Sequence, residues 1–188
     1  MKILITYSLI FVMLFCKAQQ ILPLNTSASL ASEYSYFKDL NNELNQYTGL
    51  WKATIQDKTI ILNISVQIKE PIVRFNKNFF RDQLFIRYEI KENGIIVEST
   101  LNKNFTNDIA LSIKSAYSEN NGSMVKLLFS GGNCSVGIGL ITLKKINTTT
   151  LSWDYHPGTT TRNDITCPPN LDYNIYLPET ENLIFTKQ

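Results

Sequence analysis

The strongest constraint on the fold is the two-residue alternation in TIILNISVQIK, residues 59–69. Aliphatic side chains occupy every second position of this segment: Ile60, Leu62, Ile64, Val66 and Ile68. The positions between them are polar, as at Asn63 and Lys69. Because successive side chains of a strand point to opposite faces, the pattern predicts an antiparallel strand with one buried face and one exposed face.

The same alternation recurs in LFIRYEIK, residues 84–91, and in further short segments up to NLIFTK, residues 182–187. Asn93-Gly94 follows the first of these and suits the positive φ angles of a type I′ hairpin turn. About eight to ten short strands favour a mainly β fold, either a single antiparallel β-barrel or a barrel-like sandwich. One short helix is predicted before them, over residues 32–46, because Phe37, Leu40 and Leu44 follow helical spacing after a possible N-cap at Ser32.

The N-terminus has the features of a secretory signal over residues 1–18, with a basic start followed by the apolar run 3–15. The run is shorter than the roughly 20 apolar residues of a spanning helix. Cleavage after Ala18 would give a secreted or periplasmic protein. Alternatively, Cys16 is the lipidated cysteine of an outer-membrane-associated lipoprotein, although Phe15 stands where such signals have a small residue. A polar spacer, residues 19–31, and a single β domain, residues 32–188, are expected to follow.

Charge and cysteine content narrow the classes of partner and fold. Removing Lys2 and Lys17 with the signal leaves 16 basic and 16 acidic residues, so the mature chain has no basic footprint for nucleic acid. The only membrane contact predicted is the alternative lipid anchor at Cys16. Cys134 and Cys167 are expected to form a disulfide in an oxidising compartment, with two buried free thiols as the alternative.

Aromatic residues provide the candidate binding sites. RFNKNFFRD, residues 74–82, sets Phe75, Phe79 and Phe80 beside Arg81 and is a candidate recognition loop, with an ordinary solvated loop as the alternative. Trp51 is the fifth candidate for ligand binding with these four residues, and the alternatives for it are the plug at one end of a barrel or simply a core residue.

No catalytic residues are predicted. His156 is the only histidine, and it belongs to no metal-binding or nucleophile motif. The sequence indicates no metal site and no cofactor. An enzyme, of hydrolase type, is therefore the third of three functional hypotheses.

Two resemblances add to these expectations. YFKDLNNELNQYTGLWKATI, followed by DQLFIRYEIKENGIIVESTL, resembles a domain-of-unknown-function family of small exported proteins from Bacteroidota. This resemblance implies export from a Gram-negative cell and a compact β domain, and it assigns no functional residue. Gly49 and Trp51 resemble the opening of lipocalin-type barrels, which implies a ligand-binding barrel.

The first hypothesis is therefore an exported, non-enzymatic binding module for an apolar small molecule, a glycan or a protein partner in the cell envelope. The second is a structural or interaction protein with a filled core and no ligand pocket. An apolar cavity of about 300 to 1,000 Å³ would favour the first hypothesis over the second.

Overall fold

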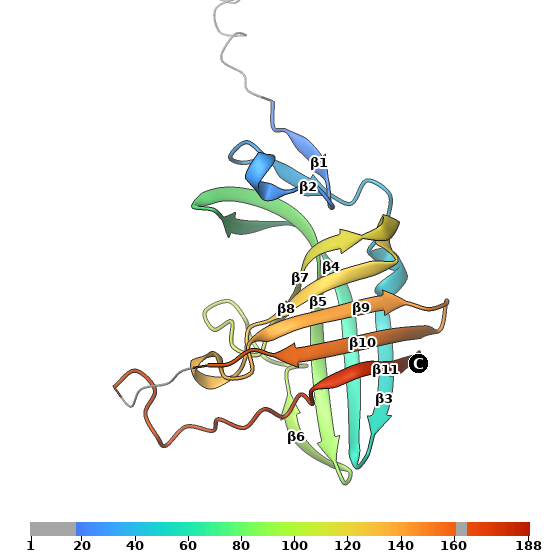
Figure 1. The fold of residues 1–188 in the computed structure, drawn as a ribbon, viewed down its shortest axis with the longest axis vertical. Coiled ribbons are helices and arrows are strands. Elements are labelled where there is room, and N and C mark those ends of the chain that lie inside the picture. The colour runs from blue at the N-terminus through green and yellow to red at the C-terminus, as the bar shows by residue number, and fades with distance from the viewer. Residues whose placement is uncertain (1–17, 161–164) are drawn as a thin grey trace, which may run out of the picture.

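The computed structural model describes residues 18–160 and 165–188 (Figure 1). The predicted signal peptide and the candidate lipidation residue Cys16 therefore lie outside the described residues, save for Ala18. The strands are β1 (Ile21–Pro23), β2 (Tyr36–Lys38), β3 (Gly49–Ile55), β4 (Lys58–Arg74), β5 (Lys77–Glu92), β6 (Ile95–Ser99), β7 (Ile113–Glu119), β8 (Met124–Phe129), β9 (Gly139–Lys145), β10 (Thr150–Pro157) and β11 (Thr180–Lys187). The described helical segments are short 3₁₀ turns: η1 (Ala28–Leu30), η2 (Asn45–Tyr47), η3 (Asn120–Gly122) and η4 (Asn133–Ser135).

Eight of the strands form a closed antiparallel barrel in the order β5-β4-β3-β11-β10-β9-β8-β7, with β7 pairing back to β5. This confirms the predicted fold class. Two ladders of the barrel are short. β5 and β7 pair only at Phe85–Lys114 and Ile86–Ile113, and β11 and β3 pair only at Thr186–Lys52 and Lys187–Trp51. The turn between β5 and β6 has positive φ at both Asn93 and Gly94, as predicted.

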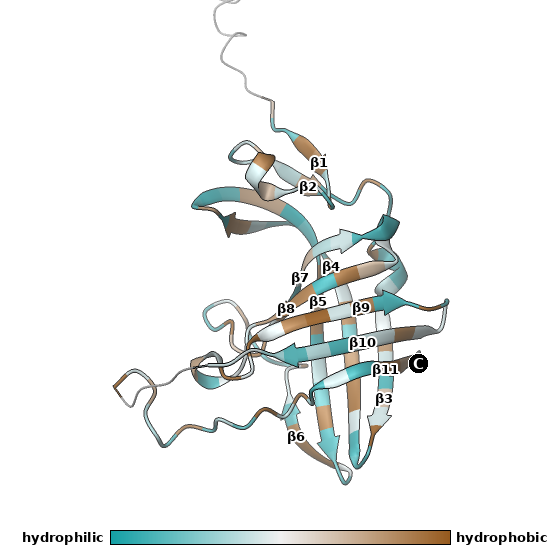
Figure 2. Ribbon diagram, viewed as in Figure 1, coloured by the Kyte–Doolittle hydropathy of each residue, from teal (hydrophilic) through white to brown (hydrophobic). Residues whose placement is uncertain are grey.

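Large side chains occupy the interior of the barrel. Its most deeply buried aromatic residues are Trp51, Tyr88, Phe129, Trp153, Tyr155 and Phe185. Three of them form hydrogen bonds: Trp51 Nε1 donates to the Tyr47 carbonyl oxygen at 2.8 Å, the Tyr88 hydroxyl donates to Glu98 at 2.7 Å, and the Tyr155 hydroxyl donates to the Gly137 carbonyl oxygen. An eight-stranded barrel is just wide enough for side chains to fill it. Figure 2 shows the matching alternation of hydrophobic and hydrophilic residues along the barrel strands.

Strands β4 and β5 continue beyond the barrel as a curved hairpin, here called the arm, whose tip is the turn Phe75-Asn76 (Figure 1). A bulge between Gln67 and Glu70 bends β4 where the arm begins, and Lys69 has φ 57° there. The buried Asp82 carboxylate holds the bend, because it accepts hydrogen bonds from the Tyr36 hydroxyl and from the backbone N–H groups of Asp39 and Lys69.

The prediction of a helix over residues 32–46 is wrong. Tyr36–Lys38 instead form β2, which pairs in parallel with β5 on one side and with β1 on the other. Phe37 is fully buried and meets Phe79 edge-on with ring centroids 5.5 Å apart. Asn42 has φ 56°, which interrupts any helix, and the Asp39 carboxylate accepts two backbone N–H groups in the turn that follows. Sheet pairing and tertiary burial therefore outweigh the helical spacing.

The segment predicted as a polar spacer, residues 19–31, contains β1 and η1, and its Leu24 and Ala31 are buried. At the other end of the chain, the predicted disulfide is confirmed: Cys134 is bonded to Cys167. This bond ties the segment between β10 and β11 to η4. Within residues 18–160 and 165–188, no helix has the length and apolarity needed to cross a membrane.

Candidate functional site

A partly open pocket of about 810 Å³ lies outside the barrel. It is formed between the arm, the N-terminal segment and the outer face of β7 and β8. Its lining residues are Asn25, Thr26, Ser27, Ala28, Ile72, Val73, Arg74, Phe75, Arg81, Gln83, Ile109, Ser112, Lys114, Ser115, Ala116, Tyr117, Leu128 and Ser130. Three of them are cationic and none is acidic, so the lining residues carry a formal charge of three positive units.

The floor of the pocket consists of outward-facing residues of β7 and β8, along which inward-facing and outward-facing side chains alternate. Ile113 and Leu127 are fully buried in the barrel, so Lys114 and Leu128 lie on the outer face. Ser115 is buried between the strands, where its hydroxyl accepts the backbone N–H of Leu84 at 2.9 Å. This bond joins β5 to β7 close to the short ladder. The floor is therefore fixed to the barrel wall.

The arm forms the opposite wall, and its tip presents an unusual residue to the pocket. Phe75 and Asn76 both have positive φ, at 50° and 57°, so they form the two-residue turn between β4 and β5. Asn and Gly favour this conformation, whereas an aromatic residue is rare there. Phe75 is also 70% exposed. A strained, exposed phenylalanine at the pocket rim is consistent with a role in contacting another molecule.

Arg81 lies in the same wall and is only 6% exposed. Its guanidinium donates a hydrogen bond to the Leu24 carbonyl oxygen and stacks over the Phe37 ring at 5.2 Å. Burial and the nearby charge of Arg74 lower the pKa of Arg81 to about 10, against a smaller opposing effect of Asp82. Arg81 therefore remains a cation at neutral pH.

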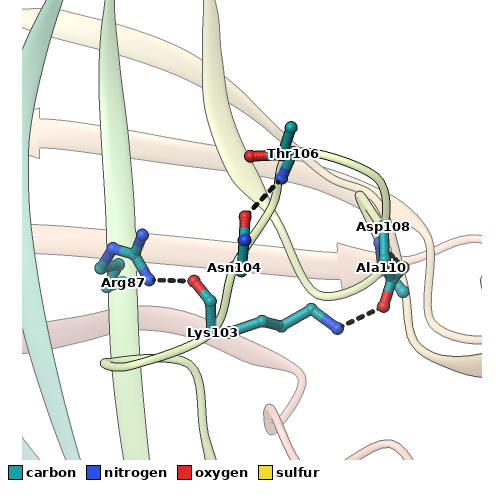
Figure 3. A network of polar contacts seen from close by, with 6 residues as sticks. All are labelled: Arg87, Lys103, Asn104, Thr106, Asp108 and Ala110. Atoms are coloured by element: carbon teal, nitrogen blue, oxygen red, sulfur yellow. Dashed lines mark hydrogen bonds and ion pairs between the residues drawn. The ribbon is translucent and has the colours of Figure 1, made fainter.

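One side of the pocket is the loop 100–112, which is anchored by a polar network (Figure 3). Arg87 donates to the carbonyl oxygens of Thr100 and Lys103 at 2.8 and 2.6 Å. Lys103 forms an ion pair with Asp108 at 2.6 Å, and this contact lowers the pKa of the Asp108 carboxyl. Ile109, the next residue, lines the pocket. The network thus holds this wall in place without a ligand.

The structure brings together two of the five residues predicted for ligand binding. Phe75 and Arg81 line the pocket. Trp51 is fully buried in the barrel, with Lys187 Nζ 5.3 Å from its ring centroid. Phe79 is buried against Phe37, and Phe80 lies on the other face of the arm, where Lys69 Nζ is 5.4 Å from its ring. These three residues lie outside the pocket lining, and their contacts contribute to the packing of the protein.

Most of the pocket could not be identified from the sequence. Lys114, Tyr117 and Leu128 alternate with buried residues and have the pattern of solvent-facing positions. Asn25 to Ala28 belong to the segment predicted as a spacer. Only the arm's position over these residues turns them into a site. The one available signal was the cluster of basic and aromatic residues in RFNKNFFRD.

Outside the pocket, the described residues contain few groups of side chains that could act in catalysis or bind a metal ion. His156 Nδ1 lies 3.5 Å from a Glu179 carboxylate oxygen, and both side chains are more than half exposed. Within the described ranges, no group of three or more His, Cys, Asp or Glu side chains is arranged to hold a metal ion. The pocket is therefore the candidate site.

Fold and pocket together define the class of protein, a closed eight-stranded antiparallel β-barrel with a cationic pocket on its outer surface beneath an extended hairpin. The whole chain, residues 1–188, matches the model of a family described as a family of unknown function (DUF6705), and the protein belongs to this family. No curated protein and no solved structure matches the chain significantly. Family membership thus brings no activity with it, and function has to be argued from the pocket.

Proposed function

We propose that the protein is an exported, non-enzymatic binding module that holds a small molecule with a substantial apolar part in the pocket outside its barrel. The observation that supports this most directly is the size of the pocket, about 810 Å³, which falls within the range of small-molecule sites. Its walls combine apolar residues such as Ile72 and Leu128 with a few polar groups, as such sites commonly do. Export is proposed from the signal-like residues 1–18.

The filled barrel interior favours an external site. Trp51, Trp153 and Tyr155 are each 1% exposed or less, so the space that an open lipocalin-type barrel would leave for a ligand is occupied here by side chains. The recess between the arm and β7–β8 is therefore the site proposed for an apolar molecule. The exposed Phe75 and the 63% exposed Ile109 flank that recess and would be covered by a bound molecule.

The proposal can be tested by titrating the purified protein with Nile red, a neutral apolar dye. Saturable fluorescence enhancement with one dye per chain is expected. Ala116→Trp should abolish it, because the added ring fills the pocket from β7, and Ala28→Trp should weaken it from the opposite side. Ile184→Trp is the matched control, since Ile184 is a half-exposed residue of β11 outside the pocket lining.

Circular dichroism would verify that each variant is folded. If the dye does not bind, or binds equally to folded Ala116→Trp, Ala28→Trp and Ile184→Trp, the pocket is not its site. The alternative of an interaction protein with a filled core would then be favoured.

A further inference from the structure

The charge balance around Arg81 indicates what kind of molecule the pocket accepts. A buried guanidinium keeps its charge and offers five N–H donors. In the described part of the chain, Arg81 takes part in no ion pair, and the hydrogen bond found for it is the one to the Leu24 carbonyl oxygen. Buried charges are normally paired because desolvation without compensation is costly. Arg81 thus lacks a counter-ion within the described chain.

The carboxylates beside Arg81 in the sequence and across the strand ladder, Asp82 and Glu70, form no ion pair with it. Asp82 follows Arg81 in β5 and so points to the opposite face, where it already accepts hydrogen bonds from Tyr36, Asp39 and Lys69. Glu70 is opposite Arg81 in the strand register but forms no ion pair with it among the described contacts. Asp82 therefore offsets the charge of Arg81 only in part, and an anionic ligand could supply the ion pair that the described chain does not.

Two more cations line the same pocket. Arg74 lies on the arm near the tip and is close enough to Arg81 to disfavour its charged form. Lys114 approaches from the floor, with its Nζ 5.7 Å from the Phe85 ring centroid. The three positive charges belong to β4, β5 and β7, and no lining residue is acidic. They therefore repel one another across the pocket. An anion would relieve this repulsion.

We infer that the ligand is an amphipathic anion, with an acidic head group that binds Arg81, Arg74 and Lys114 and an apolar body that lies against Ile72, Phe75 and Ile109. This inference rests on the proposed function and names its ligand class. A carboxylate suits the buried fork of Arg81, because guanidinium and carboxylate form paired, charge-assisted hydrogen bonds. A phosphate monoester offers the same recognition chemistry.

The test compares three molecules with the same ten-carbon chain: decanoate, decanol and decyl phosphate. Each competes with Nile red below its aggregation concentration. Decanoate is expected to bind at least about tenfold more tightly than decanol, since a hydrogen bond to a charged group contributes about 1.5 to 3 kcal/mol. Decyl phosphate identifies the preferred head group: a higher affinity than decanoate assigns phosphate, a lower one assigns carboxylate, and both support an anionic ligand.

Variants locate the head group. Arg81→Gln should remove most of the preference for decanoate over decanol. Because Arg81 is buried, this variant could unfold, so the double variant Arg74→Gln/Lys114→Gln provides a second test with less buried residues. It should weaken decanoate binding several-fold and leave decanol unchanged. The control Lys38→Gln/Lys52→Gln also removes two positive charges, at exposed residues of β2 and β3 outside the pocket lining, and should change neither.

The outcomes separate this inference from the proposed function. If decanol and decanoate bind equally well at the Nile red site, the pocket is real but the anionic head group is wrong. If the control Lys38→Gln/Lys52→Gln weakens decanoate as much as Arg74→Gln/Lys114→Gln does, the effect is one of overall charge and the inference also fails. If nothing binds at all, the proposed function fails with it.

Discussion

The two faces of β5 are both buried, but by different partners. The face with Leu84, Ile86, Tyr88 and Ile90 packs into the barrel, and each of these residues is fully buried. The opposite face carries Phe79, Arg81, Gln83 and Phe85, and it is covered by the N-terminal segment at Phe79 and Arg81 and by the loop 100–112 at Phe85.

The inner face belongs to a filled core, and the polar group among these four residues, the Tyr88 hydroxyl, is hydrogen-bonded to Glu98. The outer face keeps a buried cation and a pocket. Packing on one face thus supplies stability, while incomplete coverage of the other leaves room for binding. This difference indicates that the pocket forms where the N-terminal segment and the arm lie against the outer wall of the barrel, and not inside the barrel. The following predictions test this division, from the largest expected effect to the smallest.

Trp153→Ala should cause the largest loss of stability, because it leaves a cavity in the filled interior. Trp153 is 1% exposed and packs against Phe185 with ring centroids 5.7 Å apart. Deleting a buried aromatic side chain typically lowers the free energy of unfolding by about 3 to 5 kcal/mol. Urea denaturation measures this loss. Under conditions where the variant remains folded, Nile red should bind as in the parent protein. Selective loss of binding would mean that the dye enters the barrel.

Asp82→Asn should destabilise the arm more than the barrel. The carboxylate accepts three hydrogen bonds that join β2, the bulge of β4 and β5. An amide has one acceptor oxygen and cannot satisfy all three donors, so a decrease of about 1 to 3 kcal/mol in the free energy of unfolding is expected. Hydrogen exchange should accelerate first at Tyr36 to Lys38. Uniform acceleration throughout the barrel would contradict the idea that Asp82 acts locally.

Tyr36→Phe should flatten the alkaline dependence of stability. Burial and the Asp82 carboxylate raise the pKa of Tyr36 from 10.0 to about 12 in the folded protein. Because the folded state holds this proton more tightly, its contribution is fully present below pH 10 and is lost as pH rises towards 12. Denaturant midpoints between pH 9 and 12 should fall less in the variant than in the parent. Parallel curves would show that Tyr36 does not titrate in this way.

Phe75→Asn should have the smallest effect on stability, and it should raise stability while it weakens binding. Asparagine tolerates the positive φ at this turn better than phenylalanine, so a gain of about 1 kcal/mol in the free energy of unfolding is expected. The same change removes an apolar side chain from the pocket rim and should weaken Nile red binding. Ile95→Asn is the control, because Ile95 is 71% exposed and lies outside the pocket. Unchanged binding in Phe75→Asn would exclude a role for this residue in ligand contact.

The sequence predicted the parts of the structure that depend on local patterns. Alternation in β4 and β5 identified strands with one face in a core, and Asn93-Gly94 identified a hairpin turn. The disulfide followed from the expected compartment and the number of cysteines. The helix over 32–46 failed because the same spacing is compatible with other folds: Phe37 is buried beneath the arm, whereas Leu40 is 56% exposed.

The pocket depended on contacts between distant segments, and no local pattern reports these. Phe85 illustrates the problem. It lies on the polar face of its strand and would be expected to face solvent, yet Phe105 packs edge-on against it at 5.2 Å and it is only 5% exposed. Arg81 was identified by its aromatic neighbours, but its burial and lack of an ion partner became visible only with the N-terminal segment in place.

The two short ladders of the barrel divide it into two chain-contiguous sheets, β3-β4-β5 and β7-β8-β9-β10-β11. Each sheet is a meander of sequential antiparallel strands, and only a few backbone hydrogen bonds join one to the other along each edge. These edges are therefore the hinge lines along which the barrel should open most easily. The pocket spans one of them, with Arg81 on the first sheet and Lys114 on the second. A bound molecule would contact both sheets and hold them together at this edge. Its release should make the pairing of β5 with β7 less stable.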